Sequence, residues 1–573
     1  MARPGTSLDA SEDGSTMDVA QSLTFGGIRD GAAARLRDWQ EHAFGRRLWE
    51  KDPTLWSPEP VAEITDRLGW LHLPETMMVR VDEVTTFARE VQAAGMRHVA
   101  LLGMGGSSLA PEVFQRTFGN VQGYPALVVL DSTHPASVRA AEAVLDLSRT
   151  LFVVSSKSGT TTETLSLFQY FWQQVAAVSR HPGTQFVAIT DPETPLERLA
   201  AQRGFRRTWL APADVGGRYS ALTVFGLVPA ALIGVDIRTL LDRALTMARA
   251  CGSSIGAVEN PGLLLGAAIG EAARAGRDKL TLVTSSTLAA LPSWIEQLVA
   301  ESTGKDGKGI VPVCEEMSSP PDMYGGDRFF VCMRAHSDDS HDLDQVIEAL
   351  EARGHPIARI EIAEPADLGA EFFRWEVAVA AAGAVLGIHP FNQPDVQLAK
   401  ELTTRAMADG RAAAGVTAVA HSEVSVEPPH ALAQSLCAWM ISVRPGDYVA
   451  VQAYLPPTPA LTAALQQIRG ILSDRLHVPT TLGYGPRFLH STGQLHKGGP
   501  DTGVVLQLVD DPSAAGDLPI PETRDTFGAL IRAQALGDLQ ALRQRGRRVL
   551  RLDLGADAHC GLQRLIETMR SLA

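Results

Sequence analysis

The stretch that most limits how this chain can fold is 151–164, which reads L-F-V-V-S-S-K-S-G-T-T-T-E-T. Its four apolar residues, 151–154, are typical of the end of a buried strand. Small hydroxyl residues and one glycine then predict a turn, and Glu163 with the apolar residues after it indicates a helix. Backbone N–H groups are free at such a helix start and the helix dipole favours negative charge, so an anion can bind at this turn.

Hydroxyl side chains crowd the turn and can donate hydrogen bonds to a bound anion. There are five of them: Ser156, Ser158, Thr160, Thr161 and Thr162. The alternative interpretation is a helix N-cap, a position that serine and threonine also favour. One or two hydroxyls would indicate only a cap, whereas five around a glycine favour phosphate binding.

Apolar strand segments alternate with helical segments around this turn. Four segments are typical of buried strands: 98–102, 126–130, 151–154 and 186–189. Strands that alternate with helices predict a parallel sheet covered on both faces. Ligands of such sheets bind at the carboxyl ends of the strands, where Ser107 and Ser156 both fall.

The same alternation returns twice, so we expect an α/β protein with two doubly wound parallel-sheet domains and a C-terminal α/β segment. The later strands are predicted at 280–283, 329–333, 357–362, 448–454, 503–509 and 549–554. We expect a mobile N-terminus at 1–28, a first domain at 29–250, a second at 251–404, and a connector with the C-terminal segment at 405–573. Within the last range, 405–440 is expected to be a loose connector.

Composition narrows the classes of function. The chain has 573 residues, enough for two or three cores, and its net charge of −14 argues against a general nucleic-acid binder. Its five cysteines show no C-x-x-C spacing, which favours a reducing cytoplasm. No apolar run has the length of a membrane helix, and the start of the chain lacks the pattern of a secretory signal. We therefore expect a cytoplasmic protein, with a locally positive site for any anionic ligand.

Two charged residues occupy positions suited to catalysis. Arg218 follows two glycines in G-G-R-Y-S and could reach a developing oxyanion, although a surface arginine at a helix start is the alternative. Glu301 ends a predicted helix beside the loop G-K-D-G-K-G, where a carboxylate opposes the helix dipole; the alternative is a solvated glutamate. Glu296 lies five residues earlier, about 140° around the helix, so the two glutamates are no carboxylate pair for glycoside hydrolysis.

Segment 156–164 resembles the phosphate-binding signature of sugar-isomerase (SIS) domains, and specifically that of the glucose-6-phosphate isomerase family. The segments 103–107, 216–227, 294–305 and 387–400 resemble further elements of that family, in family order. The resemblance implies two SIS-type domains. It also implies a set of ligands for the substrate phosphate, with Lys157 contributing through its backbone: Ser107, Ser156, Lys157, Ser158, Thr161 and Gln393.

The resemblance also implies the catalytic groups. Glu301 is the base that carries a proton between C1 and C2, Arg218 stabilises the enediolate, and Lys400 lies over the ring oxygen. The family's ring-opening histidine usually stands in G-T-N-G-Q-H, which is missing between 308 and 388. A later run, F-L-H-S-T-G-Q-L-H-K-G-G at 488–499, looks like a displaced counterpart, with either His490 or His496 as the catalytic group. The alternative is a histidine on a surface loop.

That later run also resembles the isomerase half of fused transaldolase–glucose-6-phosphate isomerase proteins. Residues 1–95 are too few for a transaldolase barrel of roughly 250 residues, so no transaldolase activity is expected from this chain. The family histidine can come from a neighbouring subunit, and the resemblance therefore also implies a homodimer.

The implied reaction is the interconversion of D-glucose 6-phosphate and D-fructose 6-phosphate, a step of glycolysis and gluconeogenesis, without metal or cofactor. No histidine and carboxylate spacing in the sequence suggests a metal site. Two alternatives stay open. One is an isomerase that also accepts mannose 6-phosphate, and the other is a non-catalytic SIS-domain sensor that only binds a sugar phosphate.

Overall fold

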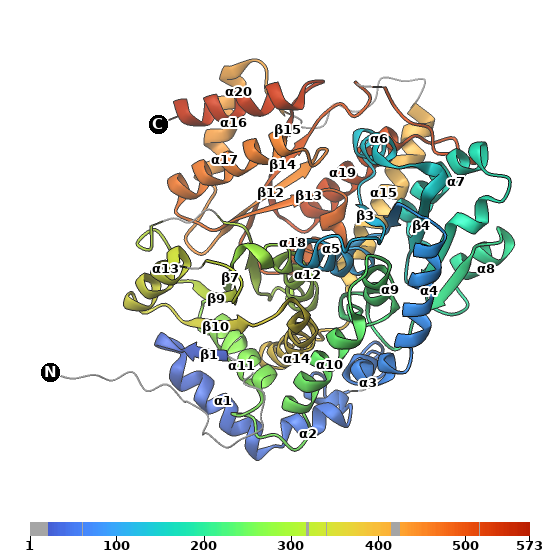
Figure 1. The fold of residues 1–573 in the computed structure, drawn as a ribbon. Helices are drawn as coiled ribbons and strands as arrows, with labels where there is room; N and C mark the ends of the chain where they lie inside the picture. Colours follow the sequence, from blue (N-terminus) through green and yellow to red (C-terminus); the bar gives the residue numbers. More distant parts are fainter. Residues whose placement is uncertain are drawn as a thin grey trace.

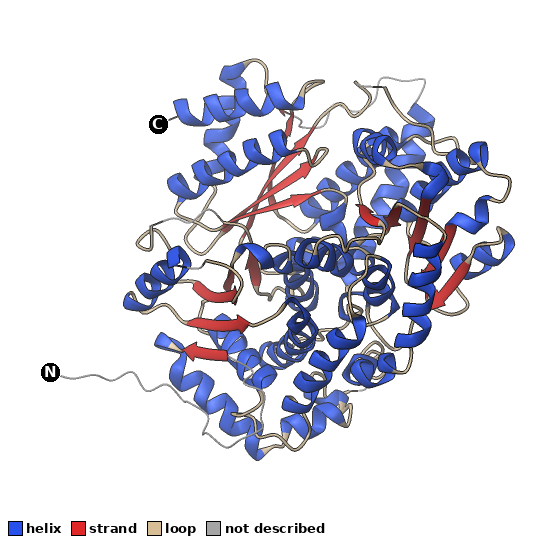
Figure 2. Cartoon of the chain, viewed as in Figure 1, coloured by secondary structure: helices blue, strands red, loops and turns tan. Residues whose placement is uncertain are grey.

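The computed structural model describes residues 21–59, 61–316, 320–339, 341–413, 424–514 and 516–572. Three separate five-stranded sheets organise these residues, and helices lie on and between them (Figures 1 and 2). All strand pairs but one are parallel. The predicted α/β class, with two sheet domains and a further α/β segment, is confirmed.

The first sheet has the strand order β3-β2-β4-β5-β6. Its strands are β2 (His98–Leu102), β3 (Ala126–Leu130), β4 (Thr150–Ser155), β5 (Phe186–Thr190) and β6 (Arg207–Leu210). From β2 the chain continues to β3, its neighbour on one side, whereas from β4 it continues to β5, in the opposite direction across the sheet. The loops that leave these two neighbouring strands therefore diverge, and this is the position at which ligands of such sheets usually bind.

The second sheet has the order β1-β10-β9-β7-β8. Its strands are β1 (Gln21–Thr24), β7 (Lys279–Thr284), β8 (Val311–Val313), β9 (Arg328–Ala335) and β10 (Ile357–Ile362). Strand β1 runs antiparallel to β10, although it falls inside the range 1–28 that was expected to be mobile. That expectation is wrong for this segment, because Leu23 and Phe25 pack on the core while the backbone of β1 pairs with β10.

The third sheet has the order β11-β15-β14-β12-β13. Its strands are β11 (Val424–Ser425), β12 (Tyr448–Tyr454), β13 (Thr480–Tyr484), β14 (Gly503–Val509) and β15 (Arg548–Asp553). Neighbouring strands β12 and β14 are again the point where the connections diverge. A second hydrophobic core, separate from the one under the first two sheets, fills the space around this sheet.

Helices occupy most of the range 405–440, where a loose connector was expected. Helix α15 (Pro394–Ala413) covers its start and α16 (Pro429–Ile441) its end, while 414–423 lies outside the described residues. Helix α16 forms because Leu432, Leu436 and Trp439 recur at helical spacing and bury one face. The expectation of a loose connector is therefore wrong for the described part.

The remaining helices cover the sheets and join the units. They include α1 (Arg29–Glu41), α2 (Phe44–Trp49), α3 (Leu73–Met78), α4 (Val81–Ala93), α5 (Leu109–Phe118), α6 (Pro135–Val144), α7 (Thr162–Val178), α8 (Pro195–Gln202), α9 (Val224–Leu232) and α10 (Ile237–Ala250). Later helices are α11 (Pro261–Arg274), α12 (Leu291–Thr303), α13 (His341–Ala352), α14 (Leu368–Leu386), α17 (Pro459–Leu476), α18 (Gly493–Gly498), α19 (Phe527–Gln544) and α20 (Ala558–Ser571). Across the described ranges, no helix combines the length and apolar character needed to cross a bilayer.

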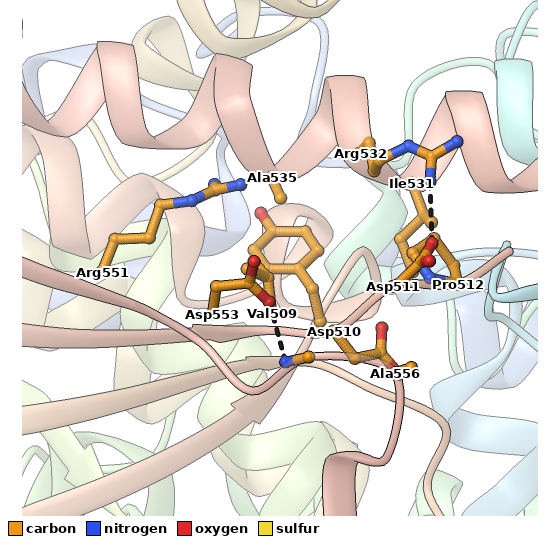
Figure 3. A pocket seen from close by; sticks show the side chains of 12 residues that line it. Val509, Asp510, Asp511, Pro512, Ile531, Arg532, Ala535, Arg551, Asp553 and Ala556 are labelled. Atoms are coloured by element: carbon orange, nitrogen blue, oxygen red, sulfur yellow. Dashed lines mark hydrogen bonds and ion pairs between the residues drawn. The ribbon is translucent and has the colours of Figure 1, made fainter. Parts of the chain in front are cut away.

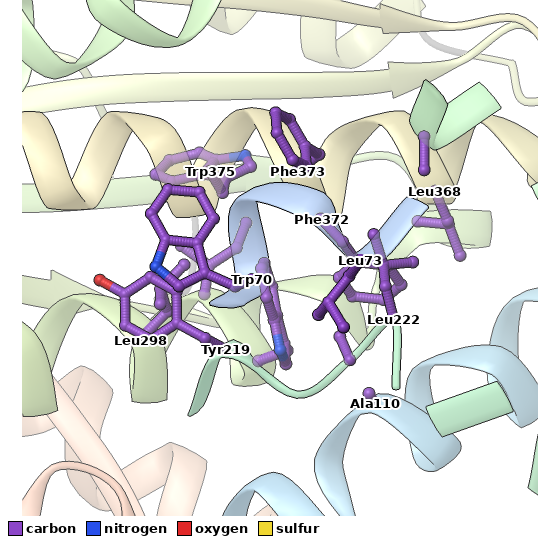
Figure 4. Packing of buried hydrophobic residues seen from close by; sticks show 14 of the residues in the cluster. Trp70, Leu73, Ala110, Tyr219, Leu222, Leu298, Leu368, Phe372, Phe373 and Trp375 are labelled. Carbon is purple, nitrogen blue, oxygen red and sulfur yellow. The ribbon is translucent and has the colours of Figure 1, made fainter. Parts of the chain in front are cut away.

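An aromatic cluster between the first two sheets anchors the turn that carries Arg218 (Figure 4). Tyr219 stacks on Trp70 with ring centroids 5.3 Å apart, and Trp70 lies 6.0 Å from Phe373 of α14. All three side chains are buried. Because Tyr219 is fixed in this core, the neighbouring Arg218 has a rigid backbone position.

Candidate active site

Two loops that lie far apart in the sequence meet the glycine-rich turn after β2. Gly105 has a left-handed backbone, with φ of +54°, and a Cβ there would lie 2.7 Å from the His490 carbonyl oxygen. On the other side, the Ser220 hydroxyl donates to the Gly106 carbonyl at 3.4 Å. The turn 103–107, which carries Ser107, is therefore packed between the arginine turn at 216–220 and the loop of His490.

The hydroxyl-rich turn after β4 bonds largely to itself. The Ser156 and Thr161 hydroxyls lie 2.8 Å apart, and the Gly159 N–H donates to Ser156 Oγ at 3.1 Å. Thr161 is the N-cap of α7, but its side chain makes no capping hydrogen bond. Lys157 directs its ammonium group to the Asp191 carboxylate. The hydroxyls that the sequence placed around this turn, including Ser158, which bonds Thr160 at 2.9 Å, are thus gathered at one edge of the first sheet.

Arg218 is the centre of the second group of polar residues. Its side chain is buried and donates to Ser302 Oγ at 2.8 Å and to Gln393 Oε1 at 2.9 Å. It also donates to the backbone carbonyls of Pro390 at 2.6 Å and Asn392 at 3.0 Å. These bonds connect the arginine turn to α12 and to the loop before α15. The nitrogen Nη1, which donates to Gln393, also faces Glu301.

Glu301 lies in the last turn of α12, whose C-cap is Gly304. Its Oε2 atom lies 3.7 Å from Arg218 Nη1 and accepts a hydrogen bond from Gln297 Nε2 at 3.1 Å. The same Gln297 amide also donates to the His490 carbonyl at 2.8 Å. The carboxylate is therefore held between a guanidinium and an amide, close to the loop that carries His490.

Lys305 holds the loop that contains Gln393. Its buried ammonium donates to the His389 carbonyl at 2.8 Å and to the Asn392 carbonyl at 2.5 Å. Burial, reinforced by the positive charge of Arg218, lowers the pKa of Lys305 well below its ordinary value. This role of Lys305 is not predicted from the sequence, although the residue stands in the G-K-D-G-K-G loop beside the predicted base.

His490 pairs with a carboxylate from the phosphate signature itself. Its Nε2 atom lies 3.0 Å from Glu163 Oε1, and the same oxygen accepts a hydrogen bond from Gln534 Nε2 at 2.7 Å. Burial raises the pKa of Glu163, but the charge and hydrogen bond of His490, with a smaller effect of Lys400, hold it below the ordinary value. Lys400 of α15 is exposed and belongs to this end of the site through its charge.

His496 lies in a different environment. Its Nδ1 atom is 3.0 Å from the Tyr448 hydroxyl, and its ring is buried against Phe488. Burial, and secondarily the charges of Lys497 and Arg547, lower the pKa of His496 to about 3. The structure therefore brings His490, and not His496, to another charged residue of the cluster.

Direct contacts thus join three predicted site residues, Arg218, Glu301 and Gln393, and the Gln297 amide links Glu301 to the backbone of a fourth, His490, within one chain. The sequence does not predict a role for Gln297, Ser302 or Gln534, and it predicts only a helix start at Glu163. Glu163 could have been found, because it stands inside the phosphate signature. Gln534 had no signal, since it meets Glu163 across 371 positions of sequence.

A cavity of about 400 Å³ lies elsewhere, at the carboxyl edge of the third sheet (Figure 3). Tyr454, Asp510, Arg551 and Asp553 are among its lining residues, and none of the predicted site residues lines it. The described residues contain no group of three or more His, Cys, Asp or Glu side chains arranged to hold a metal ion. The polar cluster around Arg218 is therefore the candidate active site.

Comparison with known proteins gives a consistent assignment. A sequence model of the family described as phosphoglucose isomerase matches residues 76–325. The chain is 29% identical over 407 residues to a glucose-6-phosphate isomerase of Rubrobacter xylanophilus, covering 63% of this chain and 93% of the relative. It is 30% identical over 388 residues to a glucose-6-phosphate isomerase of Staphylococcus haemolyticus, covering 59% of this chain and 86% of the relative.

Solved structures show the same fold. A glucose-6-phosphate isomerase from Chlamydia trachomatis has a TM-score of 0.51 at 18% identity, over 67% of this chain and 85% of that one. The matched family range contains the phosphate signature, Arg218 and Glu301. Taken with the two relatives, these findings show that the chain belongs to the phosphoglucose isomerase family.

Proposed function

We propose that this chain is a glucose-6-phosphate isomerase, which interconverts D-glucose 6-phosphate and D-fructose 6-phosphate through an enediolate without a metal ion. The observation that carries the proposal is the contact of Arg218 with both Glu301, at 3.7 Å, and Gln393, at 2.9 Å. One buried cation thereby joins the proposed base to a proposed phosphate ligand. A protein that only binds sugar phosphates would have no need of this pairing.

Proton transfer between C1 and C2 is the role proposed for Glu301. A base for this step must face two adjacent carbons, so its carboxylate has to be held in place. The Gln297 amide fixes Oε2 at 3.1 Å, and the carboxylate lies in the last turn of a buried helix. Negative charge then develops on the enediolate oxygens, and the guanidinium of Arg218 stabilises it in a site shielded from water.

Ring opening is the role proposed for His490, together with Lys400. As the bond between C1 and the ring oxygen breaks, that oxygen gains a proton and the C1 hydroxyl loses one. The Glu163 carboxylate at 3.0 Å orients the imidazole for this exchange. None of the described residues gives His496 such a carboxylate partner, and its ring is buried against Tyr448, so His490 alone is proposed as the catalytic histidine.

Phosphate binding is proposed for the hydroxyl-rich turn, with Gln393 contributing from the second unit. The proposed ligands are Ser107, Ser156, Ser158, Thr161, Gln393 and the backbone of Lys157. Arg218 occupies the amide oxygen of Gln393, which leaves the amide N–H groups to donate to phosphate. Because the Lys157 ammonium pairs with Asp191, a backbone contribution from this residue fits better than a side-chain one.

Assembly and location complete the proposal. We propose a homodimer in the cytoplasm, where the five free thiols would stay reduced. The dimer is not proposed to share the site, because His490 reaches Glu163 within one chain. We further propose that the C-terminal α/β segment is related to the isomerase half of fused transaldolase–isomerase proteins.

A coupled assay tests the function directly. Fructose 6-phosphate is supplied, glucose 6-phosphate is followed through an NADP-dependent dehydrogenase, and mannose 6-phosphate is offered as a second substrate. Glu301→Gln is expected to lower kcat at least about a hundredfold, because it removes the base but keeps the shape. Glu296→Gln on the same helix is the matched control. Binding without turnover in the wild type would favour a sensor, and full turnover of Glu301→Gln would remove the proposed base.

A further inference from the structure

Helix α19 of the third unit reaches the proposed active site through one side chain. Gln534 is 3% exposed, and its Nε2 atom donates to Glu163 Oε1 at 2.7 Å. Its Oε1 atom accepts a hydrogen bond from the hydroxyl of Thr133, which is fully buried, at 2.8 Å. The glutamine therefore bridges two residues of the first unit from outside that unit.

The chemistry of the two partners fixes the direction of the amide. The Glu163 carboxylate can only accept, so it must face the NH₂ group, while the Thr133 hydroxyl can donate to the amide oxygen. A flipped amide would set its oxygen against the Glu163 carboxylate and lose that hydrogen bond in a buried place, at the full cost of desolvation. Gln534 is thus a rigid donor aimed at one carboxylate oxygen.

That oxygen is the one that pairs with His490. Glu163 Oε1 accepts from Gln534 at 2.7 Å and lies 3.0 Å from His490 Nε2. We infer that Gln534 is a positioning residue of the isomerase: it holds Glu163 in the orientation that aims His490 at the ring oxygen of the substrate. This inference rests on the proposed function and extends it to the added C-terminal unit.

The same helix also packs against the helix that carries Lys400. Helices α15 and α19 lie side by side in Figure 1, and a Cβ at Gly537 would lie 2.7 Å from the backbone nitrogen of Thr403. Because Gly537 has no side chain, the two helices approach closely at this point. One helix of the third unit therefore supports both groups proposed for ring opening.

The charges around Glu163 decide how a substitution at Gln534 will behave. His490 contacts the carboxylate, and both Lys400 and Tyr454 lie close enough to interact with it electrostatically. One turn further along α19, Asp538 is paired with Lys497 at 2.6 Å in a fully buried contact. Because that aspartate already has its cation, a new acid at position 534 would act mainly on Glu163.

Two variants test the inference, Gln534→Glu and Gln534→Leu. In Gln534→Glu, a protonated carboxyl can donate to Glu163 at low pH as the amide does, whereas at high pH the two carboxylates repel. Its kcat relative to the wild type is expected to rise about tenfold or more as the pH falls from 8.5 to 6. In Gln534→Leu the donor is missing at every pH, so its relative kcat is expected to be low, about a tenth to a hundredth, and flat.

Gln540 of the same helix is exposed, and Gln540→Glu and Gln540→Leu serve as matched controls with unchanged kcat. Thermal melting of all variants separates loss of folding from loss of turnover. Two results would overturn the inference. One is a wild-type kcat in both Gln534 variants. The other is an equal loss of kcat with the same pH dependence in both variants, which indicates a purely structural role. A wild type without isomerase activity would instead refute the proposed function.

Discussion

The left-handed turn at Gly105 gives the sharpest test of how the loops of the site depend on one another. Its φ of +54° is a conformation that side chains with a Cβ adopt at a cost of about 1–2 kcal/mol. A Cβ at this position would also lie 2.7 Å from the His490 carbonyl oxygen and 2.9 Å from Gln297 Nε2. Gly105→Ala therefore combines backbone strain with a steric clash against two residues of the proposed site.

The size of the effect follows from these two parts. Contacts of a Cβ are normally longer than 3.0 Å, so the His490 loop has to move by a few tenths of an ångström. Inserting a methyl group into a packed site costs about 1–3 kcal/mol, which added to the strain gives about 2–5 kcal/mol. Since a misplacement of about 1 Å lowers rates about a hundredfold, this smaller shift of His490 is expected to lower kcat about tenfold.

Gly95→Ala is the matched control, because Gly95 has a φ of +72° and nothing within 4 Å of a Cβ. It carries the same kind of strain without the clash, and we expect lower thermal stability with unchanged kcat. Both variants are measured by calorimetry and by the coupled isomerase assay. If Gly105→Ala keeps the kcat of Gly95→Ala, the close packing of this turn on the His490 loop has no bearing on turnover, and the reasoning fails.

Three further predictions concern single side chains. His490→Gln is expected to lower kcat about a hundredfold while His496→Gln stays within about twofold, and equal losses in the coupled assay would contradict the choice of His490. Because burial lowers the pKa of His496 from 6.5 to about 3, the native state binds fewer protons than the unfolded state below pH 6.5. Its contribution to stability is present above pH 6.5 and is lost as the pH falls, by about 2 kcal/mol at pH 5. Denaturant unfolding at pH 7 and pH 5 should show this loss in the wild type and a smaller one in His496→Gln. Lys305→Met is expected to cost about 2–4 kcal/mol, because two partly buried carbonyls lose their buried donor, and a wild-type melting temperature would refute that role.

Strands with continuous apolar runs could be predicted from the sequence. The segments 98–102 and 448–454 have the bounds that the structure shows, because a strand buried on both faces consists mostly of apolar residues. Strands β8 and β13 could not be predicted, because neither has a continuous apolar run. Val311–Val313 has three residues with a central proline, and Thr480–Tyr484 is half polar. Both lie at a sheet edge, where one partner strand is enough.

The proposed site could be predicted only in part. Residues that share a local signature, such as Ser156 and Thr161, stay together because a turn of six residues holds them. The choice between His490 and His496 needed the partner Glu163, which lies 327 positions away and follows from how the third unit docks. The local sequence pattern contains no information on that docking. For the same reason it does not indicate that Gln534 contacts Glu163.

Strand β1 has a consequence for handling the protein. It lies beside β10 at the border of the second sheet and satisfies backbone groups that would otherwise face solvent. An unpaired border strand is a template for pairing with other chains. Shortening the chain beyond Thr24 would therefore uncover β10. Self-association into larger particles is the expected outcome, and it should precede any loss of the catalytic function proposed for Glu301.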